Sequence, residues 1–495
     1  MSFLNFNSSG NWFGQMLKYS LLIYVQVVVW IFKHELIRDN DTIAAVSTAV
    51  GNAGISIIRV SGDKAFDIAS KIFKGKGNFL EYPSHTIRYG KIVDPDTNEV
   101  IDEVLISKMA APKTYTTEDV VEINCHGGFV TAKRILDLLF RMGIRPAEPG
   151  EFTKRAFLNG RIDLVQSEAI MDLICSVTEK SSKAAVTQLE GRLSHKLNRI
   201  RESLVDILAK IEVNLDYPEY DFEEVTIREC TEVINGIRND LKRLIESFDY
   251  GKVLREGLNV AIIGKPNAGK SSLLNRLSGK NRAIVTDIPG TTRDILEEYV
   301  NIQGLPVKLL DTAGLRETAD EVEKIGVEKA LEVIDIADLI LFMLDAQTGF
   351  EKEDSEILEK IKNYSSKILY VVNKTDSTDE EKLGEIRKRV SDIIEISVLE
   401  DYGIDNLEKA ILDYVNKSGI DADSQVIVTN ARHKKLLKDA LDSLDSAVAA
   451  AESGMTLDLI SMDIKNAAEK IGFITGHEIT EEVVMNIFEN FCIGK

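Results

Sequence analysis

Residues 259–271, NVAIIGKPNAGKS, decide the fold of one part of this 495-residue chain. An apolar run that predicts a buried strand ends at Gly264, and a glycine-rich loop then leads into a predicted helix. The backbone N–H groups of such a loop, together with the helix N-terminus, can wrap phosphate groups. Lys270 would reach the β- and γ-phosphates, and the Ser271 hydroxyl would ligate Mg²⁺. The candidate phosphate-binding residues are Asn267, Ala268, Gly269, Lys270, Ser271 and Ser272.

The apolar runs that follow the loop extend this architecture. VKLLD (307–311), LILFMLD (339–345) and ILYVVNK (368–374) are typical of buried strands, and helical stretches separate them. This alternation predicts a mostly parallel sheet with helices on both faces. We therefore expect a P-loop α/β domain over residues 256–419.

Three motifs at strand ends indicate which nucleotide is bound. The carboxylate of a DTAG motif can hold the magnesium shell, and its glycine N–H can sense a γ-phosphate. The carboxylate of an NKTD motif can accept the ring N–H and the exocyclic amine of guanine, which adenine does not offer. Backbone amides after the strand 392–396 could meet the guanine oxygen. These candidates for GTP binding are Asp311, Thr312, Ala313 and Gly314, then Asn373, Lys374, Thr375 and Asp376, and finally Ser397, Val398 and Leu399.

A polar loop between the two phosphate motifs is expected to cover the nucleotide. It contains Thr286, Asp287, Ile288, Pro289, Gly290, Thr291 and Thr292. We expect Thr292 to complete the magnesium shell. Leu315 follows the DTAG motif, so the glutamine that orients water in Ras-like proteins is absent and hydrolysis needs another device.

The residues outside 256–419 predict two further kinds of structure. Short strands at 55–60, 85–93, 103–109 and 119–125 alternate with helices at 63–73 and 129–142, which predicts an N-terminal α+β domain over 39–156. Leu189, Leu193, Leu197, Ile200, Leu204, Ile207 and Ile211 form one stripe of a long amphipathic helix. Further helices are predicted from Asn430 onward, including 457–471 and 481–491. We expect one helical domain built from 157–255 and 420–495, with the α/β domain inserted into it.

Residues 1–38 form an atypical N-terminal extension. Tyr19–Phe32 is an apolar run of about fourteen residues, shorter than the ~20 that span a bilayer. No small-residue cleavage site follows it. We expect no stable membrane association, and the alternative of a membrane-tethered signalling GTPase depends on this run alone.

Composition limits the partners and the compartment. The chain has 60 basic and 80 acidic residues, a net charge of −20, which repels a phosphate backbone at long range. Any nucleic-acid contact is therefore local or shared with a partner. The four cysteines lie far apart and indicate neither a disulfide framework nor a zinc site, so a reducing cytoplasm is expected.

Two features outside the nucleotide motifs leave alternatives open. Glu122, Asn124 and His126 alternate along a strand and lie on one face, which is either the lining of a pocket or a solvated sheet face. Cys492 stands in an apolar, helical terminus, where a buried structural thiol is the ordinary interpretation.

Four segments resemble the MnmE (TrmE) family of tRNA modification GTPases. They are GKPNAGKSSLLN, TDIPGTTRD, DTAGLRETADEVEKIG and the terminal FCIGK, and the likeness covers essentially everything from Asp39 onward. It implies a potassium-activated GTPase in which Asn267, Thr286, Ile288 and Thr291 ligate K⁺. It also implies that Glu323 orients the attacking water, although the residues alone rank it with Glu317 and Glu321. Val398 departs from the family's usual alanine, which matters little for a backbone contact.

The resemblance also implies one-carbon chemistry and partners. Arg59, Glu122, Arg161 and Lys495 match the residues that bind 5-formyl or 5,10-methylene tetrahydrofolate, with Arg161 replacing a lysine of some relatives. The likeness of the FCIGK tail also implies a catalytic role for Cys492. The implied assembly is a homodimer with the FAD-carrying flavoprotein MnmG, which together add a carboxymethylaminomethyl-type group to C5 of the wobble uridine of tRNA. The alternative is a ribosome-assembly GTPase of the Era or Der kind, although the sequence has no plausible GXXG clamp and no second Walker A loop.

Overall fold

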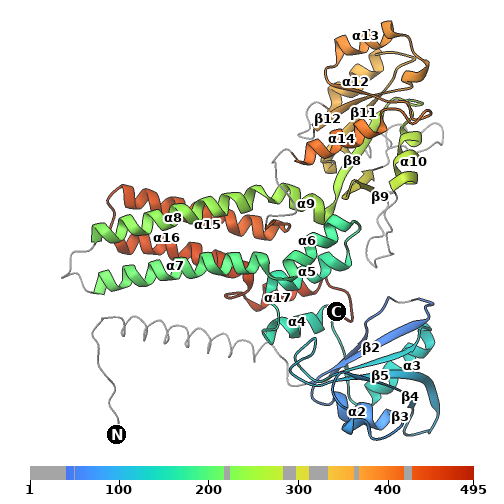
Figure 1. Ribbon diagram of the computed structural model, residues 1–495, viewed down its shortest axis with the longest axis vertical. Helices are drawn as coiled ribbons and strands as arrows, with labels where there is room; N and C mark the ends of the chain where they lie inside the picture. The colour runs from blue at the N-terminus through green and yellow to red at the C-terminus, as the bar shows by residue number, and fades with distance from the viewer. Residues whose placement is uncertain are drawn as a thin grey trace. The chain divides into compact units, whose positions relative to one another are not determined.

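The computed structural model describes two compact units, drawn in Figure 1. The first takes in Met1–Met171, Ser194–Arg238 and Asp439–Lys495, and the second Asp172–Leu193 and Asn239–Lys438. The extension 1–38, the loop 286–292, the motif 311–314 and Glu323 lie outside the described residues. The described residues are 41–49, 51–216, 223–281, 297–310, 333–361, 367–416 and 426–495.

A seven-stranded sheet forms the N-terminal part of the first unit, in the order β3-β4-β5-β6-β2-β1-β7. Neighbouring strands are antiparallel, except that β1 and β7 are parallel. Apolar residues of α2 (Ala65–Ile72) and α3 (Phe129–Arg141) pack with the inner face of the sheet in one core. The strands are β1 Ile43–Val46, β2 Ile55–Ser61, β3 Phe73–Gly75, β4 Thr86–Val93, β5 Val100–Met109, β6 Val120–His126 and β7 Arg145–Pro146.

The two faces of this sheet differ as the strand pattern predicts. In β6, Val121, Ile123 and Cys125 are buried, whereas Glu122, Asn124 and His126 are more exposed. The prediction that these three polar residues share a face is therefore confirmed. Leu105 of β5 is paired with Asn124, and Tyr89 of β4 with Leu105, so these exposed apolar side chains lie on the same outer face.

The remaining helices of the first unit range from 8 to 25 residues. The complete ones are α4 Glu151–Leu158, α16 Leu457–Thr475 and α17 Glu481–Phe488, while α5 Leu164–Ile174, α7 Arg192–Asp216, α8 Glu223–Glu246 and α15 Ala431–Glu452 have residues in both units. The predicted single stripe from Leu189 is wrong at its start, because Leu189 ends the separate helix α6 (Glu179–Leu189). Gly191 has φ +82° and breaks the helix there. The last helix is also shorter than predicted, since it ends at Phe488 rather than at residue 491.

A six-stranded sheet forms the centre of the second unit, in the order β13-β12-β11-β8-β10-β9. All neighbours are parallel except β9 and β10. The strands are β8 Leu258–Gly264, β9 Glu297–Ile302, β10 Leu305–Leu310, β11 Leu339–Asp345, β12 Lys367–Asn373 and β13 Ile393–Glu395. The predicted mostly parallel sheet is confirmed.

Helices cover both faces of this sheet (Figure 1). Val260 and Ile262 of β8 pack in a core with α9, α10 and α14, whereas Ala261 and Ile263 pack in a second core with α12 and α13. These helices are α9 Phe248–Glu256, α10 Lys270–Asn281, α12 Lys352–Ile361, α13 Glu380–Arg389 and α14 Ile404–Val415. Among the described residues, no helix is both long and apolar enough to cross a membrane.

Candidate functional sites

The phosphate loop connects β8 to α10 and depends on close backbone approaches. Gly264 and Gly269 have φ of +155° and +100°. A Cβ atom on Gly269 would lie 2.1 Å from the Asn373 amide nitrogen, and one on Gly264 would lie 2.3 Å from the Met343 carbonyl oxygen. Only glycine fits at both positions. The loop therefore keeps the backbone shape that a phosphate cradle requires, and in this respect the residues fit the predicted nucleotide.

The Lys270 ammonium lies against this loop. It donates to the carbonyl oxygens of Gly264 and Lys265, both at 2.7 Å. Ser271 and Ser272 follow in the first turn of α10, and Asn267 adopts φ +64° within the loop. All six predicted phosphate-binding residues of this loop thus lie together in the described part of the chain.

Side chains at the carboxyl ends of β12 and β13 join the loop to the predicted base-binding motif. The Asn373 amide donates to the Ala268 carbonyl oxygen at 2.9 Å and accepts from the Val398 N–H at 3.2 Å. Hydrogen bonds from Ser377 and Ser397 lower the pKa of the exposed Asp376 carboxyl. Asp376 is consequently ionised at neutral pH and can accept two N–H groups.

Other residues of the base-binding motif are held by residues at the ends of neighbouring strands. Lys374 pairs with Asp345 at the end of β11, with 2.6 Å between Nζ and Oδ2. Thr375 donates from both its N–H and its hydroxyl to the Ile396 carbonyl oxygen. Leu399 is 83% exposed, so only its backbone is suited to recognition. The motifs predicted at 373–376 and 397–399 lie side by side.

The second candidate site lies in the first unit, on the outer face of the seven-stranded sheet. Arg59 of β2 and Glu122 of β6 are cross-strand partners, with 2.9 Å from Nε and 2.8 Å from Nη2 to the same carboxylate oxygen, Oε1. Arg59 Nη1 also donates to the Gly494 carbonyl oxygen at 3.4 Å. The C-terminal tail therefore lies beside residues that are more than 370 positions away in sequence.

The tail itself is fastened to β1. The Ser47 hydroxyl donates to the Gly494 carbonyl oxygen at 3.0 Å. Gly494 has φ +89°, and a Cβ atom there would lie 2.2 Å from the Val46 carbonyl oxygen. This close approach explains why the penultimate residue is glycine.

Tyr115 is a residue of this site that sequence reasoning missed. The Arg59 and Arg161 guanidinium carbons lie 5.0 and 4.9 Å from the centre of its ring, within the range of cation–π contacts. Arg161 also donates to the Tyr115 carbonyl oxygen at 2.9 Å, and the Tyr115 hydroxyl is 2.8 Å from the Thr153 hydroxyl. In the sequence Tyr115 is only one aromatic residue in a polar turn, so no local signal singles it out.

Lys495 and Cys492 complete the tail. Burial, followed by the positive charge of Arg59, lowers the pKa of the Lys495 ammonium. Cys492 is half-buried and not helical, so the expectation of a buried thiol in a helical terminus is wrong. The physical reason is that α17 ends at Phe488 and the chain then turns toward β1, with the Cys492 carbonyl accepting from the Gly150 N–H at 3.3 Å.

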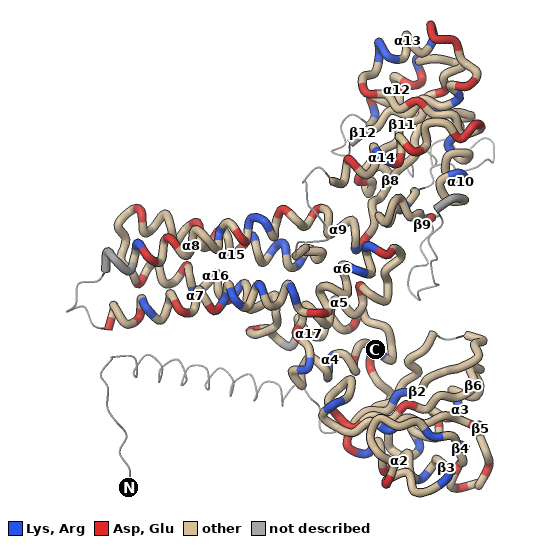
Figure 2. Tube along the Cα trace, in the orientation of Figure 1, with Lys and Arg blue, Asp and Glu red and all other residues tan. Residues whose placement is uncertain are grey.

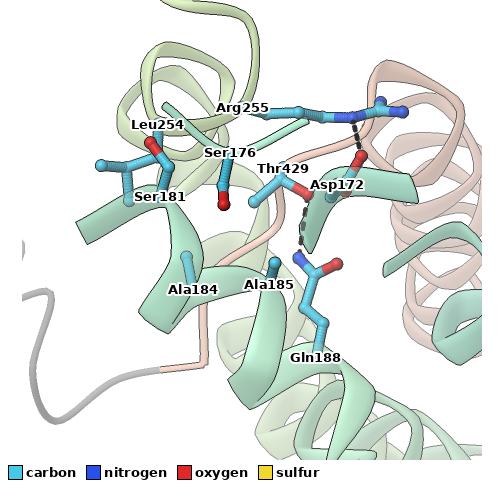
Figure 3. Close-up of a pocket in the computed structure, with 9 residues that line it drawn as sticks. All are labelled: Asp172, Ser176, Ser181, Ala184, Ala185, Gln188, Leu254, Arg255 and Thr429. Atoms are coloured by element: carbon cyan, nitrogen blue, oxygen red, sulfur yellow. Dashed lines mark hydrogen bonds and ion pairs between the residues drawn. The ribbon is translucent and has the colours of Figure 1, made fainter. Parts of the chain in front are cut away.

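A small cavity in the second unit belongs to neither site (Figure 3). Its volume is about 10 Å³, which is room for about one water molecule and not for a nucleotide. Its polar side chains are already engaged, since Arg255 donates to Asp172 at 2.8 Å and Gln188 to Thr429 at 2.9 Å (Figure 3). We assign it no function.

Two matching family models and two similar curated proteins bear the name MnmE or TrmE. A family model described as GTP-binding protein TrmE N-terminus matches residues 42–161, and one for the MnmE helical domain matches 164–492. The tRNA modification GTPase MnmE of Acetivibrio thermocellus is 53% identical over 92% of this chain and 99% of that protein. That of Alkaliphilus oremlandii is 50% identical over 92% and 99%. A crystal structure of Aquifex aeolicus Era bound to GDP.AlF4- is 32% identical over 37% of this chain and 65% of Era, with a TM-score of 0.27.

Proposed function

Because this chain belongs to the MnmE family of tRNA modification GTPases, we propose that it hydrolyses GTP under activation by K⁺ and modifies wobble uridines with the flavoprotein MnmG. The product is a carboxymethylaminomethyl-type group at C5, the one-carbon unit comes from tetrahydrofolate, and MnmG carries the FAD. The observation that supports the one-carbon part of this proposal is that four residues from distant segments lie in one place, two of them against Tyr115 and the other two beside Arg59. They are Arg59, Glu122, Arg161 and Lys495.

In the proposed nucleotide site, side chains of this protein bind the phosphates, hold the cations and orient the attacking water. Lys270 binds the β- and γ-phosphates, and Ser271 with Thr292 holds Mg²⁺, which when bound offsets the charge of the phosphates. Asn267, Thr286, Ile288 and Thr291 would hold K⁺, which when bound would offset the charge that develops in the transition state. Glu323 orients the attacking water. Asp376 selects guanine, because its ionised carboxylate accepts two N–H groups.

In the proposed folate site, the charged side chains suit 5-formyl or 5,10-methylene tetrahydrofolate. The guanidinium groups of Arg59 and Arg161, held against the Tyr115 ring, are suited to the folate carboxylates. Arg59 contacts Oε1 of Glu122, and we assign Oε2 of the same carboxylate to the donor edge of the pterin. Burial and the positive charge of Arg59 lower the pKa of Lys495, and its ammonium adds a further donor to the site.

The outer sheet face supports a homodimer built through the N-terminal domain. Ile55, Ile87, Tyr89 and Leu105 are large apolar side chains, all exposed on this face. Tyr89 and Leu105 are cross-strand partners on β4 and β5, and exposed apolar pairs of this kind are typical of a protein interface. We further propose the domain division 39–156, 157–255, 256–419 and 420–495, after the extension 1–38.

Charge supports shared binding of tRNA in the cytoplasm. Arg192, Lys196, Arg199 and Arg201 precede the acidic residues of α7, so most of its basic residues gather in the first part of the helix (Figure 2). With a net charge of −20, the chain needs MnmG to supply part of the surface that binds tRNA. Both matching family models describe MnmE or TrmE proteins, which favours tRNA modification over the alternative of ribosome assembly.

The test is the chemistry of tRNA in cells. In a strain that lacks this gene, mass spectrometry of digested tRNA should show wobble uridines without the 5-substituent, and residues 39–495 should restore it. Arg59→Met should fail to restore it, whereas Arg134→Met, at an exposed arginine of α3, should succeed. Unchanged uridines in the deletion strain would instead support ribosome assembly.

Potassium activation has its own test. Replacing KCl by NaCl should abolish most GTP turnover by the purified chain while leaving GDP binding intact, because only the hydrolysis step uses the second cation. Equal rates in the two salts would contradict it.

A further inference from the structure

Lys265, the second residue of the phosphate loop, is a buried lysine without a part in the motifs described above. Only 7% of this residue is exposed. Its ammonium lies 2.6 Å from Glu351 Oε2 and 2.9 Å from Asp354 Oδ2. Burial alone would lower the pKa of Lys265, but the two carboxylates outweigh it and raise the pKa. The residue therefore remains charged in a place where charge is retained only when it is paired.

Its partners are fixed to the start of α12. Asp354 is fully buried, and its Oδ2 atom also accepts from the Glu351 N–H at 2.9 Å. An acidic residue that bonds the backbone N–H three positions before it caps a helix N-terminus. Leu358 and Ile361 of α12 pack with Phe342 of β11 in the core of the sheet. Lys265 thus links the phosphate loop to a helix that packs in the core of the sheet.

The main chain of the same residue contacts the loop's functional lysine. The Lys265 carbonyl oxygen accepts from Lys270 Nζ at 2.7 Å and from the Ala268 N–H at 3.4 Å. The side chain of Lys265 is therefore held by α12 while its carbonyl faces the interior of the loop. A movement of Lys265 would displace both groups that it contacts there.

We propose that Lys265 is a positioning residue for nucleotide binding, which holds the phosphate loop in its binding geometry through Glu351 and Asp354. The inference rests on the proposed nucleotide site. A loop that is ordered in advance loses less entropy when the nucleotide binds, so the ion cluster contributes to affinity. The ion cluster takes no part in the chemistry of hydrolysis, because Lys265 acts through the backbone of the loop. The expected signature is weaker GDP and GTP binding with turnover at saturating GTP retained.

Three variants of the full chain test this. Lys265→Met removes the ammonium but keeps an unbranched side chain, and should raise the Kd for fluorescent GDP about tenfold, as for loss of a charged hydrogen bond. Lys265→Arg retains the charge and should restore binding. Lys352→Met is the matched control, since Lys352 is the first residue of α12 and its side chain is 92% exposed. Its Kd should equal that of the wild type.

A fourth variant separates positioning from folding. Asp354 Oδ1 has no hydrogen-bond partner within the described part of the chain, so Lys265→Met leaves a buried carboxylate worse compensated and is expected to lower the Tm. In the double variant Lys265→Met with Asp354→Asn, the amide oxygen can still cap α12. The Tm should recover while the Kd stays raised.

The outcomes are distinct. Unchanged nucleotide binding by folded Lys265→Met would overturn the inference, and so would recovery of affinity together with Tm in the double variant. Failure of the wild-type chain to bind GDP would instead overturn the proposed nucleotide site.

Discussion

Replacing Gly494 by alanine should displace the C-terminal tail and weaken tetrahydrofolate binding. Gly494 has φ +89°, and an added Cβ atom would lie 2.2 Å from the Val46 carbonyl oxygen. That oxygen belongs to the backbone of β1, which is paired with β2 and cannot give way cheaply. The tail is expected to move instead, and to take Lys495 with it.

The magnitude follows from the contacts that the tail would lose. The hydrogen bonds from Ser47 and Arg59 to the Gly494 carbonyl oxygen, at 3.0 and 3.4 Å, contribute about 1 kcal/mol or less each. A left-handed conformation costs alanine about 1 kcal/mol more than glycine. The sum of about 2 to 3 kcal/mol corresponds to a roughly 30- to 150-fold smaller docked population. We expect the affinity for 5-formyl tetrahydrofolate to fall by at least about tenfold.

Isothermal titration calorimetry of the full chain measures this directly. Ile493→Ala is the matched control, because Ile493 is in the same tail and is 63% exposed. The Tm of both variants should stay close to that of the wild type, since the tail adds little to the core. An affinity of Gly494→Ala within twofold of the wild type would refute the reasoning that the docked tail completes the folate site.

Three further predictions concern the loop, acid stability and a thiol. Gly269→Ala should abolish most GDP binding in a fluorescence titration, because its Cβ would meet the Asn373 amide at 2.1 Å, while Gly279→Ala, with open space around it, should bind normally. The free energy of unfolding in urea should decrease as the pH falls below about 4.5. Hydrogen bonds from arginines outweigh burial and lower the pKa of Glu151, so the unfolded chain binds a proton that the folded chain does not. A flat profile would contradict this. Burial raises the pKa of Cys125 to about 11, so iodoacetamide at mildly alkaline pH should modify this residue only after denaturation.

Much of the fold could be predicted from the sequence, because its signals are local. The apolar run of β8 alternates between two cores, and its end at a glycine-rich loop specifies a phosphate cradle through backbone geometry alone. The polar face of β6 follows from the twofold period of a strand. The break at Gly191 was missed, since an apolar stripe continues across it in the one-dimensional pattern.

The sequence by itself determined where the phosphate loop, the base-binding motif and the strands lie, because each depends on residues within a few positions of one another. Only the tertiary structure decided what surrounds them. Packing between distant segments brings Arg59 and Arg161 against Tyr115. It also places the C-terminal tail beside the end of β1, and Lys265 beside α12. The physical reason is that burial and long-range hydrogen bonding depend on how the cores assemble, and no spacing along the chain records that.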